Sequence, residues 1–201
     1  MKTNIKVLFL IFASIIIYSC NVPENNQSSY FPLKVGNKWY YYTYNLDSFD
    51  SDSIYTSCDS IVLRDDIEYY VLNSKEPWQD FQTGQRLFRE EDGKIYRYID
   101  DQEYLYLDFN HTYNDPWVLL PYLRTCEIVS ELDSFKFYNH KVFDLTCLYM
   151  HEDSQLDSIT KIYAKDIGLI HTFLALKDGA VIGNPTELIW AIIDGQKYVF
   201  K

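Results

Sequence analysis

The residues of this chain that can do acid–base or metal chemistry follow no catalytic spacing. Its carboxylates include adjacent pairs, which do not flank a bound sugar as the two acids of a glycosidase must. No GxSxG, HExxH, phosphate-loop or dinucleotide-binding motif occurs. The sequence names no catalytic residue, cofactor or metal site and leans against an enzyme. The adjacent acids and the histidines are Asp65-Asp66, Glu90-Glu91, Asp100-Asp101, His111, His140, His151 and His171.

Two of the histidines and one acidic run fall where the chain is predicted to turn. His140 lies in a predicted hairpin turn, and His151 opens the acidic run His151-Glu152-Asp153. The segment Asp47–Ser53 is also acidic, and Asp50 and Asp52 have the alternate spacing of calcium ligands. An EF-hand loop also needs an oxygen ligand at the next alternate position, which is Ile54 here, and a glycine. Solvated side chains are expected at all three places.

Aromatic residues gather in two stretches that are predicted to be irregular, Ser74–Gln85 and Phe109–Leu123. Tyr and Trp on loops can form a ligand platform, because they join apolar faces to hydrogen-bonding edges. They can also close the ends of a core, which is the favoured interpretation. A platform for glycans predicts that Trp78 and Trp117 are both exposed. The candidate platform residues are Trp78, Phe81, Tyr113, Trp117 and Tyr122.

Three cysteines follow Cys20, namely Cys58, Cys126 and Cys147. An odd number in an oxidising compartment leaves at least one thiol outside an intramolecular disulfide. No CxxC pair or Cys/His spacing of a zinc site is present. A Cys126–Cys147 disulfide and three inert buried thiols both remain open, and the second is favoured.

The N-terminus reads as a signal peptide. Lys2 and Lys6 precede an uncharged, mainly apolar run from Val7 to Tyr18. A helix of this length rises only about 18 Å, whereas a hydrocarbon core is about 30 Å thick. The run is therefore predicted to be a signal h-region and not a membrane-spanning helix.

The sequence Ile17-Tyr18-Ser19-Cys20 resembles the bacterial lipoprotein signal, in which an aliphatic residue and a small one precede a cysteine. The resemblance implies cleavage before Cys20 and lipidation of its thiol and its new amine. Stable anchoring takes more than one acyl chain. The division expected is a signal peptide over 1–19, a lipidated tether over 20–29 and one domain over 30–201.

Charge restricts the partners of this domain. The leader holds two lysines and no acid, so its removal changes the net charge from −11 to −13. Nucleic-acid binding depends on Lys and Arg that neutralise phosphates, and docking on an anionic leaflet needs basic residues too. We therefore expect the protein to contact the membrane through the lipid on Cys20 alone. We do not expect it to bind nucleic acid.

The fold class predicted is all-β. Aromatic residues are 17% of the chain, and they favour strands. Short alternating segments separated by Asp and Gly turns predict an antiparallel meander of about a dozen strands, forming a strongly curved sheet or open barrel. Asp59–Leu72 and Asp133–Thr146 look alike, which raises the alternative of two related halves. The other expected strands are Trp39–Leu46, Leu87–Glu90, Lys94–Ile99, Glu103–Asp108, Ser158–Ala164, Leu169–Leu176, Thr186–Ile193 and Lys197–Phe200.

Three motifs, FPLKVGNKW (31–39), KIYAKDIGLI (161–170) and ELIWAIIDGQKY (187–198), together resemble a family of Bacteroidetes-type lipoproteins. The resemblance implies an antiparallel β fold and an envelope location, at the periplasmic face or the surface of the outer membrane. Its motifs are structural, with Trp39 as a core anchor, and carry over no catalytic residue.

The function expected is that of an anchored envelope lipoprotein which binds an apolar or lipid-like ligand without catalysis. This expectation follows from an aromatic-rich β domain that carries no catalytic motif. A surface-exposed glycan-binding or assembly lipoprotein is the alternative, and a hydrolase is third.

Overall fold

The computed structural model describes residues 29–44, 51–74, 84–119, 124–137, 141–154, 157–176 and 185–200. The predicted signal peptide, Cys20 and nearly all of the tether lie outside these residues. In the part of the chain that is described, no helix is both long and apolar enough to cross a membrane.

The described residues form an all-β structure, as predicted. Aromatic and β-branched residues fill many strand positions, where their bulk packs well on a pleated surface. The strands are β1 (Lys38–Tyr44), β2 (Ser51–Arg64), β3 (Ile67–Ser74), β4 (Gly84–Glu91), β5 (Lys94–Ile99), β6 (Gln102–Asp108), β7 (Trp117–Leu119), β8 (Arg124–Leu132), β9 (Phe135–Lys136), β10 (Val142–Phe143), β11 (Cys147–Asp153), β12 (Asp157–Ala164), β13 (Gly168–Leu176), β14 (Thr186–Ile193) and β15 (Gln196–Val199).

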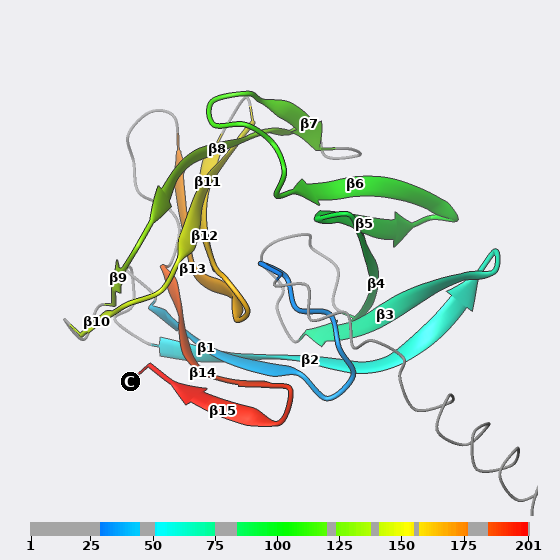
Figure 1. The fold of residues 1–201 in the computed structure, drawn as a ribbon, viewed down its shortest axis with the longest axis horizontal. Helices are drawn as coiled ribbons and strands as arrows, with labels where there is room; N and C mark the ends of the chain where they lie inside the picture. The colour runs from blue at the N-terminus through cyan, green and yellow to red at the C-terminus, as the bar shows by residue number, and fades with distance from the viewer. Residues whose placement is uncertain are drawn as a thin grey trace, which may run out of the picture.

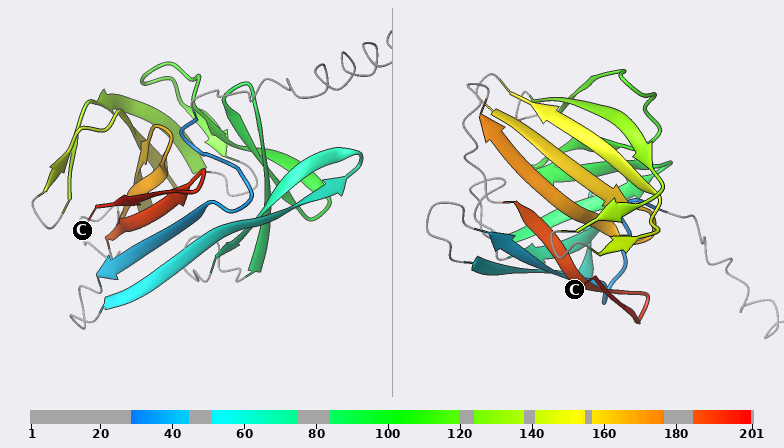
Figure 2. Two further views of the ribbon diagram at one scale, coloured as in Figure 1. Left: turned by 60° about the horizontal axis from the view of Figure 1, so that its bottom comes forward. Right: turned by 90° about the vertical axis from the view of Figure 1, so that its left-hand side faces the viewer.

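Thirteen of these strands form one sheet that curls around a central space (Figure 1). Its order is β6-β5-β4-β3-β2-β1-β14-β13-β12-β11-β8-β7, and β15 pairs with β14. Antiparallel pairing of β1 with β14 joins the first half of the meander to the second. Strands β11 to β13 lie on the opposite side of this space from the N-terminal strands (Figure 2). β6 and β7 are the two ends of the sheet order, so the sheet is curled and not a closed barrel.

Aspartates form tight turns where the sequence predicts them. Asp65 and Asp66 have φ angles of 50° and 64° between β2 and β3, and Asp100 and Asp101 have 49° and 59° between β5 and β6. Two residues of positive φ match the twist of a hairpin, and Asp is one of the few side chains that tolerate this conformation. The local sequence therefore determines these two hairpins.

The two similar segments take different places in the fold. Asp59–Leu72 lies in the long β2–β3 hairpin, whereas Asp133–Thr146 contributes the separate two-stranded sheet of β9 and β10. There, the ring of Phe137 packs edge-on against Phe135 and Phe143, at centroid distances of 4.8 and 5.4 Å. The two segments are not structurally equivalent, so the alternative of two related halves gains no support from this pair.

The prediction that His151 lies in a loop is wrong. His151 belongs to β11, which pairs with both β8 and β12. The inner face of β11 holds Met150 and Glu152, which are 0% and 2% exposed. Because charged residues are seldom buried, Glu152 is expected on an exposed face. Its position on the buried face interrupts the apolar alternation by which β11 could be predicted as a strand.

Candidate functional site

A cavity lies inside the curled sheet, and its volume is about 80 Å³. Its wall combines residues of β1–β4, β6, β12 and β13 with the segment that precedes β1. Aromatic and aliphatic side chains make up most of this wall, as is typical of pockets for small ligands. The apolar and aromatic residues include Phe31, Trp39, Tyr41, Leu72, Phe88 and Leu169.

The cavity lies where β13 separates from β14. The register joins these strands through two residue pairs, and side chains of β1 reach across to β13. Trp39 Nε1 donates a hydrogen bond of 2.6 Å to the carbonyl of Ile167, and Tyr41 Oη donates one of 3.1 Å to the carbonyl of Leu169. These bonds satisfy main-chain oxygens that need partners when buried, and they fix both rings in the cavity wall.

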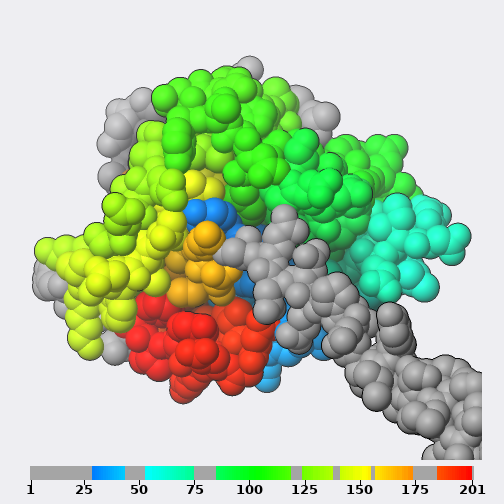
Figure 3. All heavy atoms as spheres, viewed as in Figure 1, coloured from blue at the N-terminus to red at the C-terminus, as the bar shows by residue number. Residues whose placement is uncertain are grey.

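Residues 29–32, here called the N-terminal strap, close one side of the cavity. The ring centroid of Phe31 lies 5.5 Å from that of Phe88. The Asp166 amide donates to the Ser29 carbonyl at 2.7 Å, which holds the start of the strap against the β12–β13 turn. Figure 3 shows the blue atoms of this segment between the green and orange parts of the sheet. The strap leads directly back to the predicted tether.

The cavity also has a polar corner on three neighbouring strands. Thr56 of β2 lies opposite Ser74 of β3, and the Thr56 hydroxyl donates to that of Ser74 at 3.3 Å. Arg86 of β4 lies opposite Leu72 on the next strand pair. All four residues line the cavity, so its wall is polar at one end and apolar elsewhere.

A buried ion pair joins Lys161 of β12 to Glu152 of β11. Their side chains are 4% and 2% exposed. Lys161 Nζ also lies 3.5 Å from the hydroxyl of Tyr106, a residue of β6 that lines the cavity. Burial alone lowers the pKa of Lys161, but the Glu152 carboxylate outweighs this effect and holds the pKa well above its usual range. Lys161 therefore stays protonated at neutral pH and does not serve as a base.

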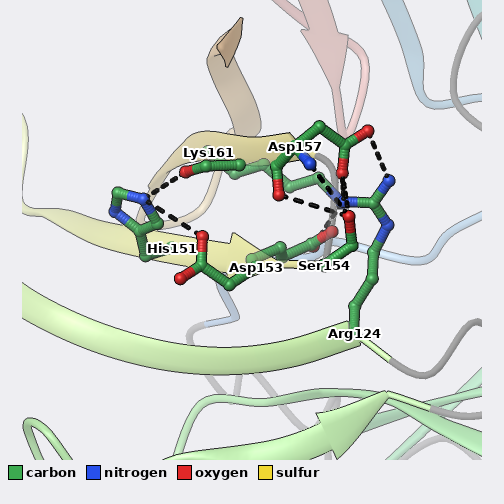
Figure 4. A network of polar contacts seen from close by, with 8 residues as sticks. Arg124, His151, Asp153, Ser154, Asp157 and Lys161 are labelled. Atoms are coloured by element: carbon green, nitrogen blue, oxygen red, sulfur yellow. Dashed lines mark hydrogen bonds and ion pairs between the residues drawn. The ribbon is translucent and has the colours of Figure 1, made fainter. Parts of the chain in front are cut away.

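A second polar network lies at the end of the β11–β12 hairpin (Figure 4). Two nitrogens of Arg124 contact the two carboxylate oxygens of Asp157 at 2.8 and 3.0 Å. The hydroxyl of Ser154 accepts from the Asp157 amide at 3.1 Å. Burial opposes ionisation of Asp157, yet its bonds to Arg124 and Ser154 lower the pKa of this carboxyl. The network ties β8 to the hairpin and offers no reactive group.

His151 and Ser158 are the nearest approach to a hydrolase dyad among the described residues. His151 Nε2 is hydrogen-bonded to the Ser158 hydroxyl, and an Asp153 carboxylate oxygen lies 3.9 Å from the same nitrogen. In a Ser-His-Asp triad the acid binds the other ring nitrogen and orients the imidazole toward the serine. Asp153 instead competes with the serine for Nε2, so this geometry does not support the hydrolase alternative.

The structure describes two of the predicted platform residues, and they differ in exposure. Tyr113 is 51% exposed, and its hydroxyl donates to Glu131 at 3.0 Å. Trp117 is 7% exposed, with its ring 4.9 Å from that of His111, so it presents no open face for a stacked sugar. The glycan-platform alternative requires an exposed Trp117 and is contradicted at this residue, whereas burial of Trp117 agrees with the favoured interpretation that these aromatic residues close the core. Trp78, Phe81 and Tyr122 lie outside the described residues, as does Cys20.

The three described cysteines are free and buried. The β8–β11 register places Cys126 opposite Glu152 and Cys147 opposite Leu132, at opposite ends of the ladder, whereas a disulfide needs Cα atoms within about 7 Å. The Cys126–Cys147 pairing is therefore excluded, and the favoured prediction of buried thiols is confirmed. Burial raises the pKa of Cys126 to about 12 and that of Cys58 and Cys147 to about 11, so few thiolates are available for reaction.

Metal ligands do not cluster in the described ranges. Within them, no group of three or more His, Cys, Asp or Glu side chains is placed to hold a metal ion. Burial lowers the pKa of His171 to about 4, so its imidazole is neutral at pH 7.

The sequence predicts a ligand-binding β domain but does not identify the residues of the cavity wall, because they carry no functional motif, and none of the predicted platform residues that the structure describes is among those that line the cavity. Trp39 was predicted only as a core anchor, and it is indeed 5% exposed. Arg86 and Phe88 lie two residues apart in β4 and both line the cavity. Side chains at this spacing share a face of a strand, so a cation on an apolar face was the one available signal.

Comparison with known proteins shows limited similarity. No protein-family model matches the chain, and no curated protein matches it. A protein from Bacteroides fragilis, described as exported with a YmcC-like fold, is 12% identical with a TM-score of 0.48. A protein from Parabacteroides distasonis, described as a lipoprotein, is also 12% identical with a TM-score of 0.42. Each match covers 85% of this chain and 99% of the other. At these scores neither protein supports a functional argument.

Proposed function

We propose that this protein is an envelope lipoprotein, anchored through Cys20, whose cavity binds an apolar or lipid-like ligand. The cavity within the curled sheet is the observation that carries the proposal. Its aromatic and aliphatic wall suits an apolar group, since burial of apolar area stabilises by about 25 cal/mol per Å². The anchor rests on the leader and on the sequence Ile17-Tyr18-Ser19-Cys20.

The size of the cavity favours a slim ligand. Its volume of about 80 Å³ is less than that of an engineered cavity of about 150 Å³ that binds benzene. The end of one hydrocarbon chain fits this space better than a fused ring system. A wider ligand requires displacement of Phe31 and Pro32, which belong to the N-terminal strap and line the cavity.

Calorimetric titration with 1-decanol tests the cavity. The wild-type protein is expected to give saturable binding of one decanol. Leu169→Phe adds ring atoms at the cavity wall and is expected to weaken binding at least about tenfold. Leu63→Phe is the matched control, because Leu63 is 60% exposed and does not line the cavity. Absence of saturable binding, or equal affinity in Leu169→Phe, contradicts the proposal.

Fractionation of cells that express the full chain tests the anchor. The wild-type protein is expected in the membrane fraction, with a mass that exceeds that of the polypeptide from Cys20 onward by the attached lipid. Cys20→Ala removes the thiol that carries the lipid and is expected to prevent both the mass increase and anchoring. Cys58→Ala changes a buried cysteine of β2 and should leave both unchanged. If Cys20→Ala stays in the membrane fraction and has the same mass increase as the wild-type protein, lipidation of Cys20 is rejected.

A further inference from the structure

The polar corner of the cavity lies at one end of an otherwise apolar wall. Thr56, Ser74 and Arg86 stand on the adjacent strands β2, β3 and β4, and all three line the cavity. Arg86 is opposite Leu72, and Ser74 is two residues further along β3. Side chains two residues apart on a strand share one face. The guanidinium group and the two hydroxyls are thus neighbours on the concave face.

The described lining of this corner includes a cation. Arg86 is the one charged side chain among the described residues that line the cavity, and no carboxylate is among them. Its Nε and Nη2 atoms are shielded from solvent. Arg97 of β5 lies opposite Phe88, is 3% exposed and has its guanidinium carbon 5.8 Å from the ring centroid of Phe88, but it does not line the cavity. An anion placed at Arg86 therefore meets a guanidinium group at low solvent exposure.

Arginine is well suited to hold such an anion. Its planar guanidinium has five N–H donors, more than one partner uses, and it binds carboxylates and phosphates through two parallel hydrogen bonds. The Thr56 hydroxyl donates its one hydrogen to Ser74, so the Ser74 hydroxyl is the one that can donate to a further oxygen of the same group. The part of the ligand attached to this head group then lies among aromatic and aliphatic side chains. The nearest of these along the strands are Leu72 and Phe88.

The buried Lys161–Glu152 pair does not compete as an anion site. Lys161 already contacts Glu152 and Tyr106, and its side chain is 4% exposed. An incoming anion would have to displace a carboxylate that is held in the same buried space. Arg86 lines the cavity directly, whereas neither Lys161 nor Glu152 does.

We propose that the ligand of this cavity is a single-chain anionic amphiphile, with its head group on Arg86 and its chain against the aromatic wall. The inference rests on the proposed binding function and adds the chemistry of the head group. A carboxylate and a phosphate monoester share this chemistry, so both belong to the test.

The experiment compares four ligands of equal chain length, namely decanoate, decyl phosphate, 1-decanol and decyltrimethylammonium, below their micelle concentrations. Wild-type protein is expected to bind at least one of the two anions about tenfold or more tightly than decanol, and the cation most weakly. Whichever anion binds better identifies the head group as carboxylate or phosphate. Affinities are measured by calorimetry on the full chain at pH 7.5, where decanoate is ionised.

Arg86→Met is expected to reduce the preference for the anion over decanol to about twofold or less. Arg86→Lys keeps the charge but not the planar fork, so it should retain part of the preference and provides the test if the methionine variant does not fold. Arg64→Met, at an exposed arginine of β2, should behave as wild type.

The outcomes separate the two proposals. If neither decanol nor any charged ligand binds wild-type protein, the proposed binding function fails. If decanol binds and the anions bind no better, or if the preference survives unchanged in Arg86→Met and Arg86→Lys, the head-group assignment is overturned while the binding function stands.

Discussion

Lys161→Met is expected to destabilise the fold by about 3–5 kcal/mol, because it leaves Glu152 as a buried carboxylate without its cation. The side chain of Glu152 is 2% exposed, so water cannot readily take the place of the lysine. Glu152→Leu should cost a similar amount by leaving Lys161 without its anion. The free energy of unfolding is measured by urea denaturation followed by circular dichroism.

The pH dependence of stability provides a second readout of the same pair. The pKa of Lys161 is held above its usual range in the folded protein, so the folded state keeps a proton that the unfolded chain loses. This contribution to stability is complete below the unfolded pKa of about 10.4 and is lost as the pH rises through the folded pKa. In Lys161→Met the free energy of unfolding should fall less steeply above pH 10 than in the wild-type protein, but it should still fall. Burial also raises the pKa of Tyr163, which adds a decline of the same sign.

Two further variants separate the buried charge from simple truncation. The double variant Glu152→Leu/Lys161→Met replaces both charges with apolar groups of similar size and should recover most of the stability lost in either single variant. Lys34→Met removes one partner of an exposed pair with Asp194, in which both side chains are more than half exposed. It should cost about 1 kcal/mol or less. Additive losses in the double variant would mean that the two residues act independently.

The strands and tight turns could be predicted from the sequence because both depend on neighbouring residues. The alternating segment Lys94–Ile99 is β5 with the bounds predicted, and the turn at Asp100-Asp101 has the positive φ angles that end it. Predicted strands near the C-terminus match β12 to β15 within a residue or so at each end. Local polarity alternation and turn chemistry are sufficient for such features.

The cavity and the ion pair depend on contacts that local patterns do not encode. Lys161 and Tyr106 are 55 residues apart and meet only because β6 and β12 face each other across the curled sheet. Glu152 looks like part of an exposed acidic run until the register of β11 turns it inward. Arg86 likewise forms a polar corner only because strand pairing places it near Ser74 and Thr56, which lie on other strands.

Trp39→Ala is expected to destabilise the protein by about 3–5 kcal/mol, the usual cost of removing a buried large aromatic side chain. The indole is 5% exposed and bridges β1 to the start of β13 through the carbonyl of Ile167. Trp39→Phe keeps most of the ring but leaves that buried carbonyl without the indole donor, so it should cost about 1–3 kcal/mol. Both values come from urea denaturation followed by circular dichroism, because three other tryptophans contribute to the fluorescence.

Trp190→Ala is the matched control for the position of the ring. Trp190 is only partly buried and stacks on Tyr40 with centroids 5.4 Å apart, so its removal should cost less than that of Trp39. Trp39 also packs against Gly168, whose missing Cβ would lie 3.3 Å from the indole nitrogen. Since β13 has few backbone pairs with β14, the indole supplies a link that the sheet itself does not. Equal losses in Trp39→Ala and Trp190→Ala would show that burial area alone, and not this link, determines the cost.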